Sequence, residues 1–303
     1  MPTQNLSVVI VSWNVCELLR GCLASLDRER HQTPDARIDA WVLDNASSDG
    51  SPDMVADEYP WVTLARSELN LGYAAGNNQV IKQILAQESP DAIWLLNPDT
   101  VIGAGCIRTM LGFLQETPRA GLIGPRLLNV DGTLQESAFR FPGLLQLLFD
   151  LQMLPQRFYY SRFNGRYSTQ ACSGSTPFQV DHPLGAAMMA RTAAVRESGL
   201  LDEGFFMYCE EIDWAWRMHK QAWTSWMVPS AVVTHYGGAS SSQVRPESLA
   251  RLWASRARLY RRHRPLWVYR VAGILVKRAW RHTEGESQEW RRARQQITEA
   301  WST

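Results

Sequence analysis

Carboxylates and one histidine recur where short apolar runs of this sequence end, and such residues bind divalent cations or move protons. The set comprises Asp44, Asp99, Glu210, Glu211, Asp213 and His235. Carboxylate oxygens with a single imidazole suit Mg²⁺ or Mn²⁺ better than a structural zinc ion. A cation held by only one or two protein groups keeps coordination positions for phosphate oxygens. The set therefore indicates a metal-assisted site for a nucleotide diphosphate.

Aliphatic runs alternate with helical periodicities in the first hundred residues, and this framework must position the acids. Four buried strands are expected, at residues 7–12, 40–43, 62–64 and 92–96. Strands that alternate with helices imply an α/β fold with a mixed, mostly parallel sheet and helices on both faces. Ligands of such sheets bind beyond the carboxyl ends of the strands. The polar segments 12–14, 44–49 and 97–99 follow three of the strands, so we expect them at one edge of the sheet.

Single residues and short segments of the sequence add detail to this framework. Asn14 is expected to cap the first helix, and residues 70–78, rich in glycine and asparagine, to form a loop that leads into another helix. Residues 130–180 are expected to be irregular and to pass over the site. Glu210 is expected to open a helix, and a late strand to end at His235.

Composition excludes several classes of protein. The chain has 303 residues, 45% hydrophobic and 20% charged, and a formal charge of +1, which excludes a globally basic nucleic-acid binder. Its five cysteines form no C-x-x-C pair, and no run of 18 apolar residues or basic leader is present, so a cytoplasmic location is expected. Dehydrogenase G-x-G-x-x-G, P-loop and G-x-S-x-G motifs do not follow the strands.

The charge is distributed unevenly along the chain. Residues 245–281 hold eleven Lys and Arg residues against one acid, a local charge of +10, with Trp and Leu interleaved. The sequence thus predicts a first domain over 1–244 and a basic, amphipathic helical extension over 245–303. Such a helix can lie on an anionic membrane surface, which would place the protein at the inner face of the cell membrane. The alternative is a helix packed on the first domain.

Seven motifs in order resemble the family 2 glycosyltransferases of the GT-A fold, and within them the bacterial rhamnosyltransferase-like branch. Across residues 6–240 they are SVVIVSWN, VLDNASSDGS, NLGYAAGNN, LLNPDT, GAAMMARTAAV, GLLDEGFFMYCEEIDWAWR and VVTHYGGAS. The resemblance implies an inverting enzyme that moves a sugar from a nucleotide-diphosphate donor, with Mg²⁺ or Mn²⁺. The branch implies dTDP-rhamnose as donor and a glycan or lipid-linked glycan as acceptor.

The resemblance also implies roles for single residues. The nucleotide would be held by Val11, Ser12, Trp13, Asn14, Asp44, Asn70, Gly72, Gly76, Asn77 and Asn97. Asp99 would bind the metal ion, His235 would complete its surroundings, and Glu211 would be the catalytic base. Asn97 replaces the first acid of the family's D-x-D, and Glu211 replaces its usual aspartate. Which of Glu210, Glu211 and Asp213 is the base therefore stays open.

Two further functions compete with glycosyl transfer. A sugar-nucleotide nucleotidyltransferase uses a related sheet but needs a basic, glycine-rich loop for a triphosphate, and residues 12–14 contain no Lys or Arg. A non-catalytic scaffold could bind a nucleotide sugar without transferring it, but it would not need the whole acidic set.

Overall fold

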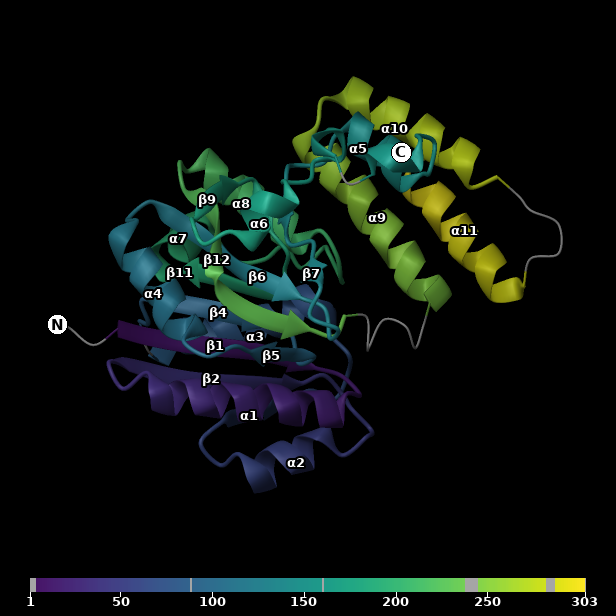
Figure 1. Ribbon diagram of the computed structural model, residues 1–303. Helices are drawn as coiled ribbons and strands as arrows, with labels where there is room; N and C mark the ends of the chain where they lie inside the picture. The colour runs from purple at the N-terminus through teal and green to yellow at the C-terminus, as the bar shows by residue number, and fades with distance from the viewer. Residues whose placement is uncertain (1–3, 88, 160, 238–244, 282–286, 303) are drawn as a thin grey trace.

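A mixed sheet of ten strands is the framework of the molecule, with a smaller helical unit beside it (Figure 1). The computed structural model describes residues 4–87, 89–159, 161–237, 245–281 and 287–302. The strands are β1 (Gln4–Ser12), β2 (Ala36–Asp44), β3 (Thr63–Arg66), β4 (Ala92–Leu96), β5 (Thr100–Ile102), β6 (Ala120–Leu128), β7 (Leu134–Gln135), β8 (Ala138–Phe139), β9 (Phe178–Val180), β10 (His182–Pro183), β11 (Ala187–Arg191) and β12 (Thr224–His235). The α-helices are α1 (Cys16–Gln32), α2 (Ser51–Glu58), α3 (Gly72–Gln87), α4 (Cys106–Glu116), α5 (Leu144–Asp150), α6 (Thr169–Ser173), α7 (Thr192–Ser198), α8 (Glu210–Lys220), α9 (Arg245–His263), α10 (Leu266–Ala279) and α11 (Gln288–Ala300).

The order of the strands brings the predicted polar segments together. Eight strands of the main sheet follow the order β3-β2-β1-β4-β11-β6-β12-β5. The other two, β7 and β9, pair with β6 and β12, while β8 and β10 form a separate pair. Strands β3, β2, β1 and β4 are parallel, and β11 is antiparallel to β4. The carboxyl ends of β1, β2 and β4 therefore meet at one edge, as the sequence predicted.

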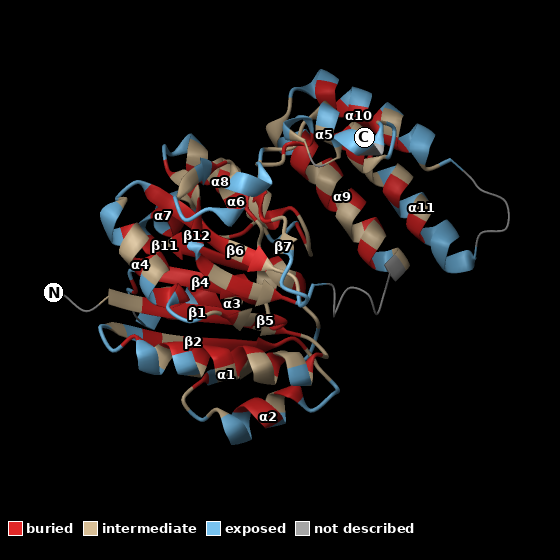
Figure 2. Cartoon of the chain, in the orientation of Figure 1, coloured by how far each residue is buried: buried red, intermediate tan, exposed pale blue. Residues whose placement is uncertain are grey.

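Alternating side chains of β1 enter two different cores. Val8 and Ile10 pack in the core on the face covered by α1, α2 and α4. Val9 packs in the core on the face covered by α3, α7 and α8. This period of two is the strand geometry itself, and it confirms the prediction of helices on both faces (Figure 2).

Two local predictions were wrong. Asn14 does not cap α1, because its Oδ1 accepts from the Ser48 N–H at 2.8 Å, and Asp49 Oδ2 instead accepts from the Cys16 N–H at 2.8 Å. Residues 72–78 are not a loop but the first turns of α3. A Cβ on Gly76 would lie 3.0 Å from Val11 Cγ1, so the glycine lets α3 approach the sheet closely. That packing outweighs the low helix propensity of Gly and Asn.

The C-terminal helices form a core of their own. Trp253, Tyr260, Tyr269 and Ile297 of α9, α10 and α11 pack together with Leu147 of α5. The predicted extension is therefore helical, but it shares its core with a segment from the earlier part of the chain. The chain turns between α9 and α10 before Pro265, the N-cap of α10. Among the described residues, no helix is both long enough and apolar enough to cross a membrane.

The start of α3 depends on Gly72. Its φ is +78°, and a Cβ there would lie 2.3 Å from the Phe206 carbonyl oxygen. We expect Gly72→Ala to lower the free energy of unfolding, measured in urea, by about 2–5 kcal/mol, from backbone strain and overlap together. Gly50→Ala is the matched control, since Gly50 has φ +83° with no neighbour within 4 Å. It should cost only about 1–2 kcal/mol. Equal losses in the two variants would contradict this account.

Candidate active site

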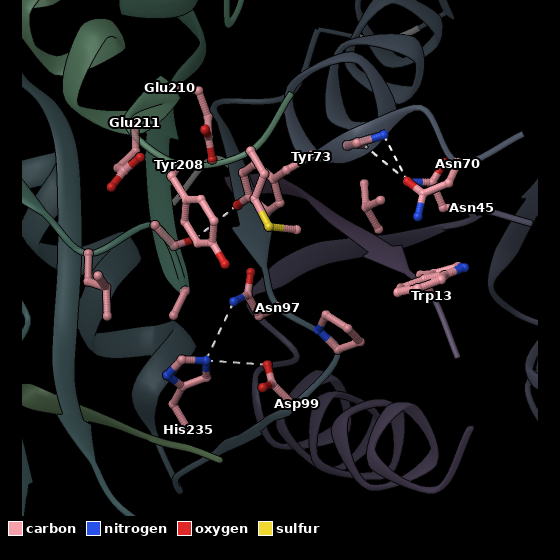
Figure 3. Close-up of a pocket in the computed structure, with 17 residues that line it drawn as sticks. Trp13, Asn45, Asn70, Tyr73, Asn97, Asp99, Tyr208, Glu210, Glu211 and His235 are labelled. Carbon is pink, nitrogen blue, oxygen red and sulfur yellow. Dashed lines mark hydrogen bonds and ion pairs between the residues drawn. The ribbon is translucent and has the colours of Figure 1, made fainter. Parts of the chain in front are cut away.

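A cavity of about 270 Å³ opens at the carboxyl ends of β1, β2 and β4, and α8 closes its other side (Figure 3). Its size is near the lower end of small-molecule sites, which span about 300–1,000 Å³. Of the predicted site residues, those that line it are Val11, Trp13, Asn70, Gly72, Asn97, Asp99, Glu210, Glu211 and His235. Those that do not are Ser12, Asn14, Asp44, Gly76, Asn77 and Asp213. The sequence thus found nine of the seventeen residues that line the cavity, and the other six predicted residues lie outside this lining.

Asp99 and His235 face each other because two short strands pair. His235 ends β12 opposite Thr100 of β5, and the Tyr236 N–H donates to the Asp99 carbonyl oxygen at 2.9 Å. His235 Nε2 then lies 3.3 Å from Asp99 Oδ1 and 3.5 Å from Asn97 Nδ2. Both Asp99 and His235 are buried. The last residues of the motif that contains His235, 238–240, lie outside the described residues.

Gln135 on β7 determines which ring nitrogen of His235 carries the hydrogen and which one presents a lone pair to the cavity. Gln135 Nε2 donates to Asn129 Oδ1 at 3.0 Å, so its Oε1 is the atom 2.7 Å from His235 Nδ1. His235 Nδ1 therefore donates its hydrogen, and Nε2 faces the Asp99 carboxylate. Two acceptors 3.3 Å apart need a cation between them, either a proton or a metal ion.

The donor set fits a divalent cation. One carboxylate and one imidazole, with the amide of Asn97 beside them, match the ligands that Mn²⁺ and Mg²⁺ accept. No group of three or more His, Cys, Asp or Glu side chains forms a metal cage among the described residues. A cation held here by two protein groups would keep positions for phosphate oxygens.

The edge of the sheet at the ends of β1 and β2 carries buried side-chain oxygens without hydrogen-bond partners. Ser12 and Asp44 are opposite each other in the β1–β2 pair, and both are at most 4% exposed. Ser12 Oγ and Asp44 Oδ1 have no hydrogen-bond partner. Because an unpaired buried polar atom is costly, such a pair is a signal for a bound donor group. Next to them, Asn45 Nδ2 donates to Asn70 Oδ1 at 3.0 Å and fixes the turn before α3.

Asn77 lies in the interior of α3 and away from the cavity lining. Its Nδ2 donates to the Tyr73 carbonyl oxygen at 2.8 Å, within the helix. Gly76 lets α3 pack closely on Val11 of the sheet, whereas the Asn77 amide bonds within its own helix.

Glu210 and Glu211 form the acidic wall opposite Asp99. Tyr208 and Cys209 precede them with φ of +71° and +69°, a conformation in which non-glycine residues are strained. Burial raises the pKa of Glu210 well above its usual range, and the Glu211 charge adds to this. Burial also raises the pKa of Glu211 to about 7, while backbone N–H groups at the start of α8 oppose the shift. Glu210 Oε2 is buried without a partner, whereas Glu211 stays partly open to the cavity.

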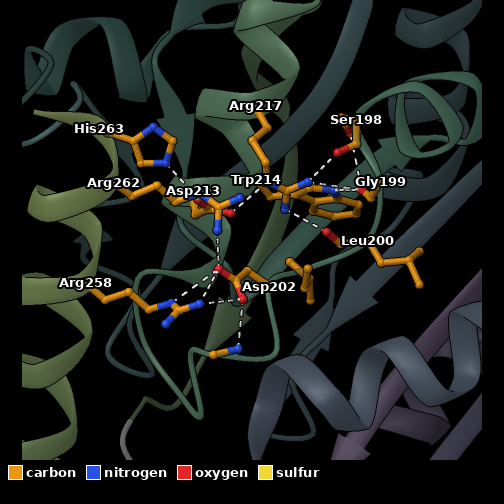
Figure 4. Close-up of polar contacts among 12 residues, drawn as sticks. Ser198, Gly199, Leu200, Asp202, Asp213, Trp214, Arg217, Arg258, Arg262 and His263 are labelled. Carbon is orange, nitrogen blue, oxygen red and sulfur yellow. Dashed lines mark hydrogen bonds and ion pairs between the residues drawn. The ribbon is translucent and has the colours of Figure 1, made fainter.

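The structure places Asp213 away from the cavity, in a network with α9 (Figure 4). Its oxygens accept from Arg217 Nε at 2.8 Å and lie 2.7 Å from His263 Nε2 and 3.1 Å from Arg262 Nε. Asp213 is fully buried, and these partners hold its pKa below its usual range against the effect of burial. The prediction that Asp213 belongs with the catalytic acids is therefore corrected. It anchors α8 instead.

The sequence matches Glycosyl transferase family 2 over residues 7–194, more than half of the chain. The chain belongs to glycosyl transferase family 2. This confirms the recognition made from the motifs, and it favours glycosyl transfer over the nucleotidyltransferase alternative. The match runs from within β1 to α7 and includes the carboxyl ends of β1, β2 and β4, whereas Glu210, Glu211 and His235 follow it in the chain.

Relatives and solved structures agree with this assignment. The glycosyltransferase is 31% identical over 251 residues to an N-acetylglucosaminyl-diphospho-decaprenol L-rhamnosyltransferase of Mycobacterium tuberculosis, covering 80% of this chain and 79% of the relative. It is 30% identical over 159 residues to a low-salt glycan biosynthesis hexosyltransferase of Haloferax volcanii, covering 50% of this chain and 44% of that one.

The fold is the GT-A fold. The structure of GalNAc-T7 with UDP, GalNAc and Mn²⁺ matches with a TM-score of 0.62 at 14% identity, covering 99% of this chain and 56% of that one. Staphylococcus aureus TarS (1–349) matches with a TM-score of 0.52 at 11% identity, covering 98% of this chain and 71% of that one.

Several residues of the glycosyltransferase site were missed by sequence reasoning. Asn45, Tyr73 and Tyr208 line the cavity, and Gln135 orients His235 from outside it. Tyr73 Oη donates to the Gly185 carbonyl oxygen at 2.9 Å and keeps the wall beside Glu211 in place. Asn45, Tyr73 and Tyr208 stand inside the quoted motifs, so those motifs were the available signal. Gln135 lies in β7, within residues 130–180 that the sequence predicted to be irregular, and no pattern singled it out.

The raised pKa of Glu211 makes the stability of the glycosyltransferase depend on pH. A carboxyl whose folded-state pKa lies near 7, above its ordinary 4.5, destabilises the fold progressively as pH rises through that window. We expect Glu211→Gln to raise the free energy of unfolding at pH 8 by about 1–2 kcal/mol, and much less at pH 5. Denaturant titrations at both pH values measure this. A variant less stable than the parent at pH 8 would contradict the assignment.

Proposed function

We propose that this enzyme transfers a sugar with inversion at the anomeric carbon, with Glu211 as the base that activates the acceptor hydroxyl. The observation that carries the proposal is the arrangement in Figure 3, where the buried acids Glu210 and Glu211 lie across the cavity from Asp99 and His235. One wall can accept a proton while the opposite wall receives the leaving diphosphate. In-line displacement needs these two functions on opposite sides of the anomeric carbon.

In the proposed transfer step, groups on the two walls of the cavity receive the acceptor proton and the leaving diphosphate. An acceptor oxygen attacks the anomeric carbon as its proton passes to a Glu211 carboxylate oxygen. The bond from that carbon to the diphosphate oxygen breaks, and the diphosphate departs with the electron pair. Glu211 suits the base better than Glu210 because a pKa near 7 leaves a large ionised fraction at neutral pH. Burial and the Glu211 charge raise the pKa of Glu210 well above its usual range, which opposes ionisation of Glu210 beside a charged Glu211.

The donor side fits a nucleotide diphosphate and a divalent cation. The buried oxygens of Ser12 and Asp44, with Val11 and Trp13 beside the cavity, support a nucleotide at the ends of β1 and β2. Asp99 and His235 would hold Mg²⁺ or Mn²⁺, which would neutralise charge on the diphosphate. Mn²⁺ in the structure of GalNAc-T7 supports this part of the proposal.

The names of the relatives suggest which sugar and which acceptor this enzyme uses. The name of the mycobacterial relative indicates rhamnosyl transfer to a lipid-linked N-acetylglucosaminyl diphosphate. We therefore extend the proposal to dTDP-rhamnose as donor and a lipid-linked glycan as acceptor, with the reaction at the cytoplasmic face of the membrane.

Metal-dependent donor binding tests the Asp99–His235 pair. We expect Asp99→Asn to retain the fold but to weaken binding of dTDP-rhamnose in the presence of Mn²⁺ by about 10–100-fold, because one ligand charge is lost. Calorimetric titration with and without Mn²⁺ measures the difference. Thr109→Ala, a half-buried residue of α4 outside the cavity lining, is a control that should leave both affinities unchanged. Full Mn²⁺ stimulation in Asp99→Asn would place the ion elsewhere.

Turnover tests the base. Glu211→Gln should keep donor affinity but lose about 10²–10⁴-fold in transfer, because an amide cannot take the acceptor proton. Glu210→Gln, which places a neutral group of similar shape where burial opposes a charge, should lose much less. Steady-state rates beside donor affinities separate the two. If Glu210→Gln were inactive and Glu211→Gln active, the roles would be reversed.

A further inference from the structure

Helix α10 presents a row of large apolar side chains to the outside of the helical unit. Leu266, Trp267, Val271 and Ile274 are 58%, 63%, 39% and 67% exposed. Trp267, Val271 and Ile274 recur at intervals of four and three, so they share one face of the helix. The opposite face packs against α9 and α11 through Val268, Ala272 and Val276. Figure 2 shows this division along α10, at the outer side of the unit.

Basic residues continue the same face. Arg270, Lys277, Arg278 and Arg281 are all exposed. The first three fall at helical intervals of three or four from Trp267 or Ile274, and Arg281 follows just after the end of α10. Residues 248–281 contain no Asp or Glu. Within the part of the chain that the structure describes, none of these four residues forms an ion pair with a carboxylate. The face therefore combines apolar side chains with positive charge that no carboxylate of the described residues pairs with.

The basic residues of α9 are arranged differently. Arg256 pairs with Asp150 at 3.0 Å, Arg258 with Asp202 at 2.9 Å, and Arg262 with Asp213 at 3.1 Å. These pairs join α9 to the sheet domain and to the end of α5, so their charge is compensated inside the molecule. We therefore apply the predicted membrane contact to α10 and not to these paired residues of α9.

We propose that the outward face of α10 docks on an anionic lipid bilayer. The exposed Trp267 suits the interface between headgroups and acyl chains, and the arginine and lysine stems can extend toward lipid phosphates. Each basic residue near such a surface strengthens binding, most at low salt, and apolar side chains add burial. The charge selects an anionic bilayer over a second copy of the chain, whose α10 face would carry the same positive charge. This binding requires neither donor nor acceptor, so it can be tested apart from the transfer reaction.

Vesicle sedimentation of the full chain tests the proposal. The probes are phosphatidylcholine vesicles and phosphatidylcholine vesicles that contain phosphatidylglycerol, each at low and high salt. We expect binding to the anionic vesicles at low salt, weakened by salt. The double variant Lys277→Ser/Arg278→Ser should bind about tenfold or more weakly, as the loss of two basic residues implies. Trp267→Ser/Ile274→Ser should also weaken binding.

Matched controls alter the same residue types on other elements. Arg28→Ser/Arg196→Ser removes the same net charge from the exposed surfaces of α1 and α7, and Leu69→Ser/Val130→Ser removes apolar residues of similar exposure. Both controls should bind vesicles like the parent. The proposal is overturned if the parent does not bind anionic vesicles, or if the controls lose as much binding as the α10 variants. Concentration-dependent self-association that the α10 variants abolish, without vesicle binding, would assign the face to a second copy and also overturn it.

Discussion

The burial of two adjacent carboxyl groups at the start of α8 is the constraint on which the site depends. Removing Glu210 and Glu211 from water opposes their ionisation, so the pKa values of both carboxyl groups rise. The fold supports this unfavourable arrangement with a buried ion-pair network one turn further along, where Asp213 binds Arg217, Arg262 and His263. Helix α9 of the C-terminal helical unit thereby fixes α8, the helix that carries the proposed base.

The remaining half of the site is built from the sheet. The parallel pairing of β1, β2 and β4 brings their ends together, and the short antiparallel pair of β5 and β12 sets Asp99 opposite His235. Gln135 then orients the imidazole so that Nε2 faces the carboxylate. The proposed displacement requires that the diphosphate charge be neutralised on one side of the cavity and the acceptor proton be removed on the other. The edge of the sheet would do the first, and the start of α8 would do the second.

Much of this arrangement could be predicted from the sequence, for physical reasons. Apolar runs followed by polar residues define the ends of parallel strands, and those ends must meet. The start of α3 could not be predicted, because Gly72 and Gly76 have low helix propensity and become helical only through packing on Phe206 and Val11. Asp213 was misplaced because helical spacing puts it near Glu210, while its partners Arg262 and His263 lie some fifty residues away in the sequence. Long-range partners of this kind leave no local pattern.

The most direct test of the central claim is the titration of the two carboxyl groups themselves. Carbon-13 NMR of glutamate-labelled enzyme, with Glu210→Gln and Glu211→Gln used only to assign the signals, gives each pKa without substrate. The account predicts that the Glu211 carboxyl titrates near pH 7 and that the Glu210 carboxyl titrates higher. Two carboxyls that both titrate below pH 5 would mean that burial does not hold a base at the start of α8, and would contradict the account.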